Sequence, residues 1–81
     1  MYKFKGSFME YVCYSEDKEE LEEFHIENIK DWCLHEYNTN MYDIDVQVLG
    51  HTEGYAYFNK GLITFKENIA GMTEYKVWGE I

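Results

Sequence analysis

The sequence predicts an α+β fold, an antiparallel β-sheet of about four strands with one helix packed on one face, in the order β-α-β-β-β. Residues 16–38 form one long segment with helical periodicity. Shorter segments on either side of it alternate apolar and polar residues, as half-buried strands do. Proline is absent, and no linker or low-complexity stretch divides the 81 residues. We therefore expect a single α+β domain over residues 1–81.

The first expected strand covers residues 2–14. Its apolar residues keep one parity up to residue 8 and change parity from residue 11 on: Tyr2, Phe4 and Phe8, then Tyr11 and Cys13. A β-bulge near residues 9–10 would account for this change, because one extra residue reverses the facing of every residue after it.

The expected helix runs from about residue 16 to residue 38. Ser15 or Asp17 can cap its N-terminus, and Asp17 with Glu20 three residues later has the spacing of a capping box. Apolar residues gather on one side of the helix: Leu21, Ile29, Trp32 and Cys33, with Ile26 and Tyr37 toward one edge. We expect His25 to lie near this side, with its ring partly packed at the boundary. Asn38, Thr39 and Asn40 end the helix.

The clearest half-buried strand follows the helix. There, apolar residues alternate with polar ones: Tyr42, Ile44, Val46 and Val48 against Asp43, Asp45 and Gln47. The residues from Gly50 to Gly54 turn the chain. Residues 55–58 and 62–66 then form either a hairpin or one long strand with a glycine bulge, since residues 59–61 suit both. After another turn at residues 69–72, a last strand covers residues 73–78.

Composition argues against several classes of function. The chain has sixteen acidic residues against seven lysines, no arginine, and a net charge of −9. Direct binding to nucleic acid is therefore disfavoured, because the Lys/Arg clusters that neutralise phosphates are missing. No apolar run reaches the length of a membrane span, and the N-terminus is too polar for a signal peptide. We expect a protein of the bacterial cytoplasm with both cysteines reduced.

The strongest functional signal is a run of carboxylates three and four residues apart in the expected helix: Glu16, Glu20, Glu23, Glu27 and Asp31. This spacing places them on one helix face, opposite the apolar side. Each like-charge pair costs a helix roughly 0.2–0.5 kcal/mol, so stability does not explain the run. Residues 15–38 carry nine acids and two lysines, a net charge of −7 out of −9. An ordinary solvated helix face is the simplest alternative explanation.

Catalytic and metal-binding patterns are weak by comparison. Some side chains are of ligand type, but they lack the spacing of a zinc site: Cys13, His25, Cys33, His35 and His51. Asp43 and Asp45 lack the glycine and distal glutamate of an EF-hand loop. The glycines are single turn residues and form no phosphate-binding loop. We therefore expect no enzyme, no metal and no cofactor.

Together these observations predict a small acidic inhibitor from a phage or mobile element, of the anti-CRISPR or anti-restriction type. Its carboxylates would stand in for DNA phosphates and bind a basic nuclease or a CRISPR or restriction effector. Asp43 and Asp45 would form a second acidic patch.

Two alternatives stay open. The chain could be an immunity or antitoxin protein that neutralises a basic nuclease toxin. It could also be a homo-oligomeric interaction module, because a single helix covers one sheet face only and leaves the other for water, a partner or a second copy. We expect some aromatics on that uncovered face, drawn from Tyr55, Tyr57, Tyr75 and Trp78.

Overall fold

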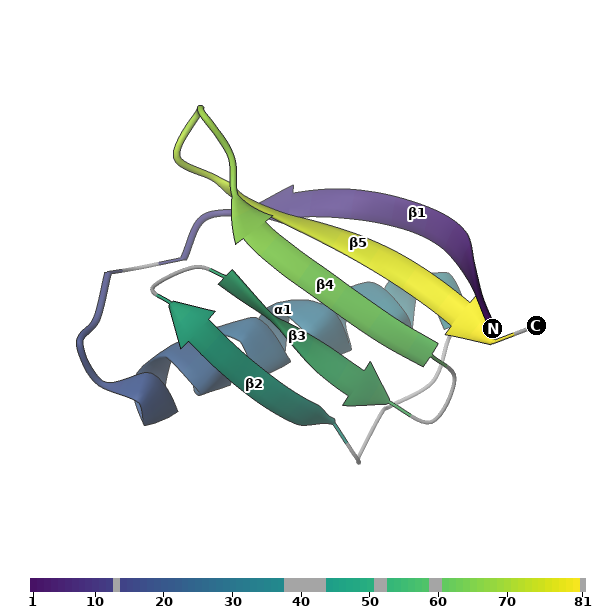
Figure 1. Cartoon of the computed structure of the whole chain (residues 1–81), viewed down its shortest axis with the longest axis horizontal. Coiled ribbons are helices and arrows are strands. Elements are labelled where there is room, and N and C mark those ends of the chain that lie inside the picture. Colours follow the sequence, from purple (N-terminus) through teal and green to yellow (C-terminus); the bar gives the residue numbers. More distant parts are fainter. Residues whose placement is uncertain (13, 38–43, 51–52, 59–60, 81) are drawn as a thin grey trace.

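The computed structural model describes residues 1–12, 14–37, 44–50, 53–58 and 61–80, and it confirms the α+β class (Figure 1). The elements are β1 (Tyr2–Glu10), α1 (Lys18–Tyr37), β2 (Asp45–Gly50), β3 (Glu53–Phe58), β4 (Gly61–Glu67) and β5 (Thr73–Glu80). The strands form one antiparallel sheet in the order β1-β5-β4-β3-β2. Helix α1 connects the two edge strands and lies behind the sheet in Figure 1, so that view looks onto the open face.

Residues 55–58 and 61–66 belong to the paired strands β3 and β4, which settles the choice between a hairpin and one bulged strand. Phe58 pairs with Gly61, and the antiparallel pairing continues without a shift to Gly54 opposite Phe65. The hairpin supplies one more strand than the approximate count of four, so the described sheet has five strands.

The bulge in β1 lies at Lys5, and the expectation of a bulge near residues 9–10 was wrong. Phe4 pairs with Trp78 and Gly6 pairs with Val77, so Lys5 is the extra residue. Gly6 has a φ of 156°, which glycine adopts without steric cost. The strand ends at residue 10 and not at residue 14.

This bulge gives the phenylalanines of β1 different faces. Phe4 packs edge-on against Trp78 on the open face of the sheet, with ring centroids 5.2 Å apart. Phe8 stacks on Tyr75 at 4.6 Å on the face that α1 covers. Their shared parity in the sequence therefore does not correspond to a shared face, because the extra residue lies between them.

Helix α1 begins two residues later than expected, and of the two expected caps it uses Asp17. Asp17 Oδ1 accepts a hydrogen bond from the backbone N–H of Glu19 at 3.0 Å, as an N-cap residue does. The expected capping box is not formed. Ser15 Oγ accepts the backbone N–H of Asp17 at 3.0 Å and donates to Glu20 Oε2 at 2.9 Å, so the serine takes the place of the direct contact.

The core lies between α1 and the covered face of the sheet. The helix contributes a buried residue at every fourth position: Leu21, His25, Ile29 and Cys33. The sheet contributes Val46, Val48, Ala56, Phe58, Ile63, Phe65, Tyr75 and Val77. Ile26, Trp32 and Ile44 pack against its edge. The expected alternation in β2 is confirmed, since Asp45 and Gln47 are exposed where Val46 and Val48 are buried.

The expected turn between the last two strands is confirmed and is held by Asn68. Its Oδ1 accepts the backbone N–H of Ala70 at 2.9 Å and that of Met72 at 3.2 Å. Gly71 has a φ of 79°, in the left-handed region that favours glycine. The turn places Ile69 fully in solvent at one end of the open face.

Candidate functional site

Four of the predicted carboxylates lie in a row on the outer surface of α1, which we call the acidic ridge: Glu20, Glu23, Glu27 and Asp31. All four are exposed, and the buried positions of the helix occupy the opposite side. Eleven residues separate the ends of the ridge, which corresponds to about 16 Å at 1.5 Å per residue. The helix thus presents its charge away from the sheet.

Little in the described structure neutralises this ridge. The ion pair found there joins His35 Nδ1 and Asp31 Oδ1 at 3.9 Å, with both side chains exposed. The same imidazole nitrogen donates to the Asp31 carbonyl oxygen at 2.8 Å, so His35 is held mainly by the backbone. Within the described ranges, no lysine lies within ion-pair distance of a ridge carboxylate. The ridge therefore keeps most of its negative charge.

The two other predicted contact residues that the structure describes, Glu16 and Asp45, lie apart from the ridge. Glu16 is in the bend before α1, so it does not extend the ridge along the helix. Asp43 lies outside the described residues. Asp45 opens β2 on the open face of the sheet, opposite Tyr57, and accepts a hydrogen bond from Gln47 Nε2 at 3.2 Å. The structure thus puts Asp45 on the side of the molecule away from the ridge.

A polar cluster that the sequence did not indicate lies inside the core. His25 Nδ1 is 2.7 Å from Tyr75 Oη, and Asn28 Nδ2 donates to the same hydroxyl at 3.1 Å. The bond between the imidazole and the phenol, whose donor follows the tautomer of His25, and the bond from Asn28 thus meet at one oxygen. Phe65 stacks on the imidazole with ring centroids 4.0 Å apart.

The enclosure of this cluster determines its role. His25 and Tyr75 both have 0% of their surface exposed. Burial raises the pKa of Tyr75 to about 12; the Asn28 bond lowers it and the charge of Glu10 raises it. The phenol therefore stays protonated at neutral pH. No substrate reaches these groups, so the cluster orders the core.

The described residues offer neither a metal centre nor a membrane helix. No three His, Cys, Asp or Glu side chains among them converge on a point that could hold an ion. Cys33, one of the candidate ligands, is buried in the hydrophobic core. Of the helices in the described ranges, none has the length and apolarity that crossing a membrane requires.

The open face carries a feature that sequence reasoning missed, a line of cross-strand neighbours that we call the apolar row. It takes one residue from each of β1, β5, β4 and β3: Phe4, Trp78, Leu62 and Tyr57. Phe4 is 50% and Tyr57 is 47% exposed, while the two central residues are half-buried. Trp78 Nε1 donates to Thr64 Oγ1 at 3.2 Å, which fixes the indole on this face.

Aromatic exposure follows the pairing. Of the four aromatics expected to divide between the faces, Tyr75 is buried against α1, whereas Tyr55, Tyr57 and Trp78 lie on the open face. Alternation with the buried Ala56 could have assigned Tyr57 to the uncovered side. The apolar row as a whole could not be predicted in this way, because it depends on the pairing register of strands that are far apart in the chain.

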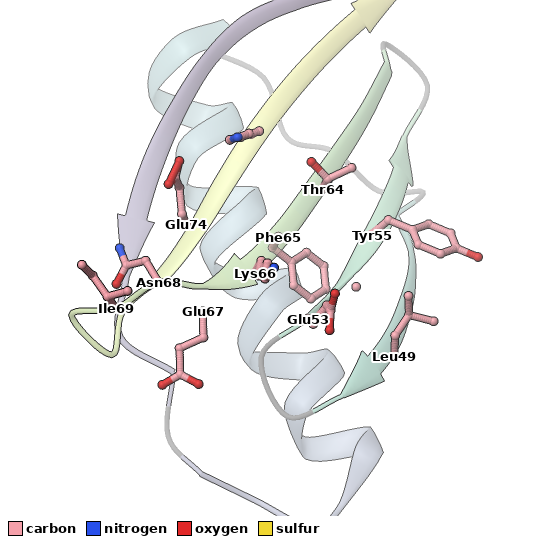
Figure 2. Close-up of a pocket in the computed structure, with 12 residues that line it drawn as sticks. Leu49, Glu53, Tyr55, Thr64, Phe65, Lys66, Glu67, Asn68, Ile69 and Glu74 are labelled. Carbon is pink, nitrogen blue, oxygen red and sulfur yellow. The ribbon is translucent and has the colours of Figure 1, made fainter.

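At the other end of the same face a wide depression of about 800 Å³ opens (Figure 2). Tyr55 and Thr64 line it, and the exposed Leu49 and Ile69 stand at its opposite sides. Its charged lining mixes both signs: Glu53, Glu67, Glu74, Lys66 and Lys76. Because positive and negative side chains are mixed in the lining, the depression does not indicate which class of small molecule it would bind.

Comparison of the chain with protein-family models, with curated proteins and with solved structures finds no match, so the geometry above is the basis for assigning a function.

Proposed function

We propose that this chain is a small protein inhibitor from a phage or another mobile element that binds a basic nucleic-acid-processing protein. Its target would be a nuclease or a CRISPR or restriction effector, blocked without catalysis. The acidic ridge is the contact surface. The observation that carries the proposal is a line of four exposed carboxylates without a lysine in ion-pair distance in the described structure.

The spacing of the ridge supports imitation of a nucleic-acid strand. Its carboxylates recur every three or four residues, or about 4.5–6 Å along the helix axis. A DNA strand carries a phosphate about every 3.4 Å of its axis, so the ridge matches the length of about five phosphate spacings. The Lys and Arg side chains of a phosphate-binding cleft could therefore contact the carboxylates of this helix as they contact the phosphates of a DNA strand.

The distribution of charge supports rapid encounter with such a cleft. Most of the net negative charge lies on the helix segment, and α1 presents the ridge outward. Concentrated charge of one sign steers a partner of the opposite sign and speeds association, and salt weakens the effect. Binding should therefore lose affinity as the NaCl concentration rises.

The test is capture of proteins from a bacterial lysate by the purified chain, with washes at low and then high salt and identification by mass spectrometry. The wild type is compared with the triple variant Glu20→Lys, Glu23→Lys and Glu27→Lys. We expect the wild type alone to capture a nucleic-acid enzyme and to inhibit it in a DNA-binding or cleavage assay.

A matched control carries the same change of net charge at exposed positions outside the ridge: Glu10→Lys, Glu36→Lys and Glu80→Lys. It should bind like the wild type. Equal inhibition by the ridge variant would rule out the ridge as the contact surface. Capture of a basic nuclease toxin, in place of a defence enzyme, would assign the chain to the immunity or antitoxin class.

A further inference from the structure

We infer that the open face of the sheet is an interface between two copies of this chain, centred on the apolar row. The inference is independent of the proposed role of the ridge, because the two surfaces lie on opposite sides of the molecule. Four observations support a second copy as the occupant: exposed apolar area, the location of charge, the signs of the charges on the face, and its size.

The apolar row is a contiguous strip of exposed hydrophobic surface. Phe4 and Tyr57, at its two ends, are each about half exposed, and Trp78 and Leu62 join them. Neighbouring side chains lengthen the strip along the β1 edge, where Tyr2 is 42% exposed. Scattered apolar residues on a surface need no explanation, but a connected strip of this kind marks an interaction site.

The location of the charge favours self-association through this face. A chain with a net charge of −9 repels its own copies, and the repulsion is weakest where the charge is furthest away. The acidic ridge points away from the sheet, so two open faces can meet with both ridges on the outside. A basic partner would be drawn to the ridge and not to this face.

The charges on the open face itself are of both signs. Lys66 and Lys76 lie beside Glu53 and Glu74, and Lys66 is the cross-strand partner of Glu74. A surface with mixed signs can pair with a rotated copy of itself, as a two-fold interface requires. A strongly acidic partner would face like charge at Glu53, Glu74 and Asp45, and a strongly basic partner would face it at Lys66 and Lys76.

The size of the face is sufficient for a stable dimer. The molecule measures 34 × 25 × 22 Å, and Figure 1 looks down the shortest axis onto the open face. The total accessible surface is 5478 Å². A face with the two longer dimensions holds roughly a fifth of that surface, or about 1,100 Å², against about 800 Å² per partner in a standard interface.

Sedimentation equilibrium of the full chain over a wide concentration range, at low and at high NaCl, tests the inference. The monomer mass is 9.8 kDa, so a dimer is easily distinguished. We expect a dimer that high salt leaves intact or strengthens, since the contact is apolar and the charges repel. The double variant Phe4→Lys and Tyr57→Lys should raise the dissociation constant about a hundredfold or more.

The matched control is the double variant Tyr11→Lys and Leu34→Lys, which adds the same charge at exposed apolar positions outside the row. It should dimerise like the wild type. Circular dichroism checks that each variant is folded. If the double row variant is unfolded, the single variant Tyr57→Ser is used in its place to test whether the row forms the dimer contact. A monomeric wild type, or row variants that dimerise as tightly as the control, would overturn the inference. The ridge variant used above should still dimerise. Loss of target binding in that variant therefore tests the proposed function, and loss of dimerisation in the row variant tests the present inference.

Discussion

The hydroxyl of Tyr75 joins the buried imidazole of His25 and the half-buried amide of Asn28. Tyr75→Phe keeps the ring but leaves both partners without this hydrogen bond in the core. The free energy of unfolding should fall by about 1–3 kcal/mol, the usual cost of unsatisfied buried polar groups. Urea denaturation at neutral pH measures the loss. Tyr57→Phe, which removes a half-exposed hydroxyl, should change little, and an equally small effect at Tyr75 would contradict the importance of the cluster.

The same hydroxyl makes stability depend on alkaline pH. The pKa of Tyr75 is raised from 10.0 to about 12 in the folded chain, chiefly by burial. The folded state therefore holds this proton more tightly than the unfolded state, so its contribution is full below pH 10 and is lost as the pH rises from 10 through 12. A shift of this size corresponds to about 2–3 kcal/mol.

The check on this pH dependence is the difference in unfolding free energy between wild type and Tyr75→Phe, measured by denaturation from pH 8 upward. All other groups are the same in both proteins, so their effects cancel in the difference. The gap between the two proteins should narrow as the pH rises above 10. A constant gap would mean that the folded and unfolded pKa values of Tyr75 are the same.

At the residue scale, the sequence predicted that His25 lies near the apolar side of the helix, but it did not predict that the ring is fully buried. The periodicity of α1 puts it between Leu21 and Ile29, in the middle of the buried stripe. Its polar ring is accommodated there because Tyr75, fifty residues later, supplies a hydrogen bond. Helical spacing alone contains no information about that partner.

At the scale of the helix, the acidic ridge sets like charges against one another. Glu27 has Glu23 four residues before it and Asp31 four residues after it. Glu27→Lys turns both like-charge pairs into opposite-charge pairs, so the free energy of unfolding should rise by about 1–2 kcal/mol at low salt. Denaturation at two NaCl concentrations measures the gain, which screening should remove at high salt.

A neutral variant separates the causes of that gain. Glu27→Gln removes the repulsion without adding attraction, so it should give about half the increase. If Glu27→Lys destabilised the chain at low salt, the ridge would have counter-charges that the described residues do not reveal. A gain in stability together with a loss of target binding would show that these carboxylates are kept for function.

Local sequence determined the elements better than their connections. The helix and the alternation in β2 follow from periodicity and matched the structure. Residues 59–61 suit either a hairpin or a bulge, and the pairing of Phe58 with Gly61 decides between them. The bulge at Lys5 depends on the register with β5, although Gly6 beside it was a usable signal.

At the scale of the whole molecule, the fold separates two surfaces that the sequence mixes. The sequence contained the acidic ridge, because its members are close in the chain and share one helix. The apolar row was hidden, because Phe4 and Trp78 are brought together by pairing of the first and last strands. One face of the molecule is thus highly charged, and the opposite face is apolar with mixed charges.

This separation predicts how salt affects thermal stability. At an ionic strength of 0.1 M the screening length is about 10 Å, shorter than the molecule but longer than the spacing of about 4.5–6 Å between ridge carboxylates. Raising the salt to 0.1 M therefore removes repulsion across the molecule. Repulsion within the ridge persists until the screening length falls to about 3 Å near 1 M. The melting temperature of the wild type should rise in both ranges.

The two triple variants distinguish these ranges, because they carry the same net charge. Calorimetry at a fixed protein concentration should show a smaller rise at low salt for both, since each reduces the overall repulsion. In the ridge variant the change at 27 turns the pair with Asp31 from repulsion into attraction, while the lysines at 20, 23 and 27 still repel one another, so the rise between about 0.1 and 1 M should also be smaller. The variant with Lys at 10, 36 and 80 should retain it, because its ridge is intact. Equal curves for the two variants would mean that net charge alone governs stability, and that the ridge carboxylates do not interact as neighbours on one helix face.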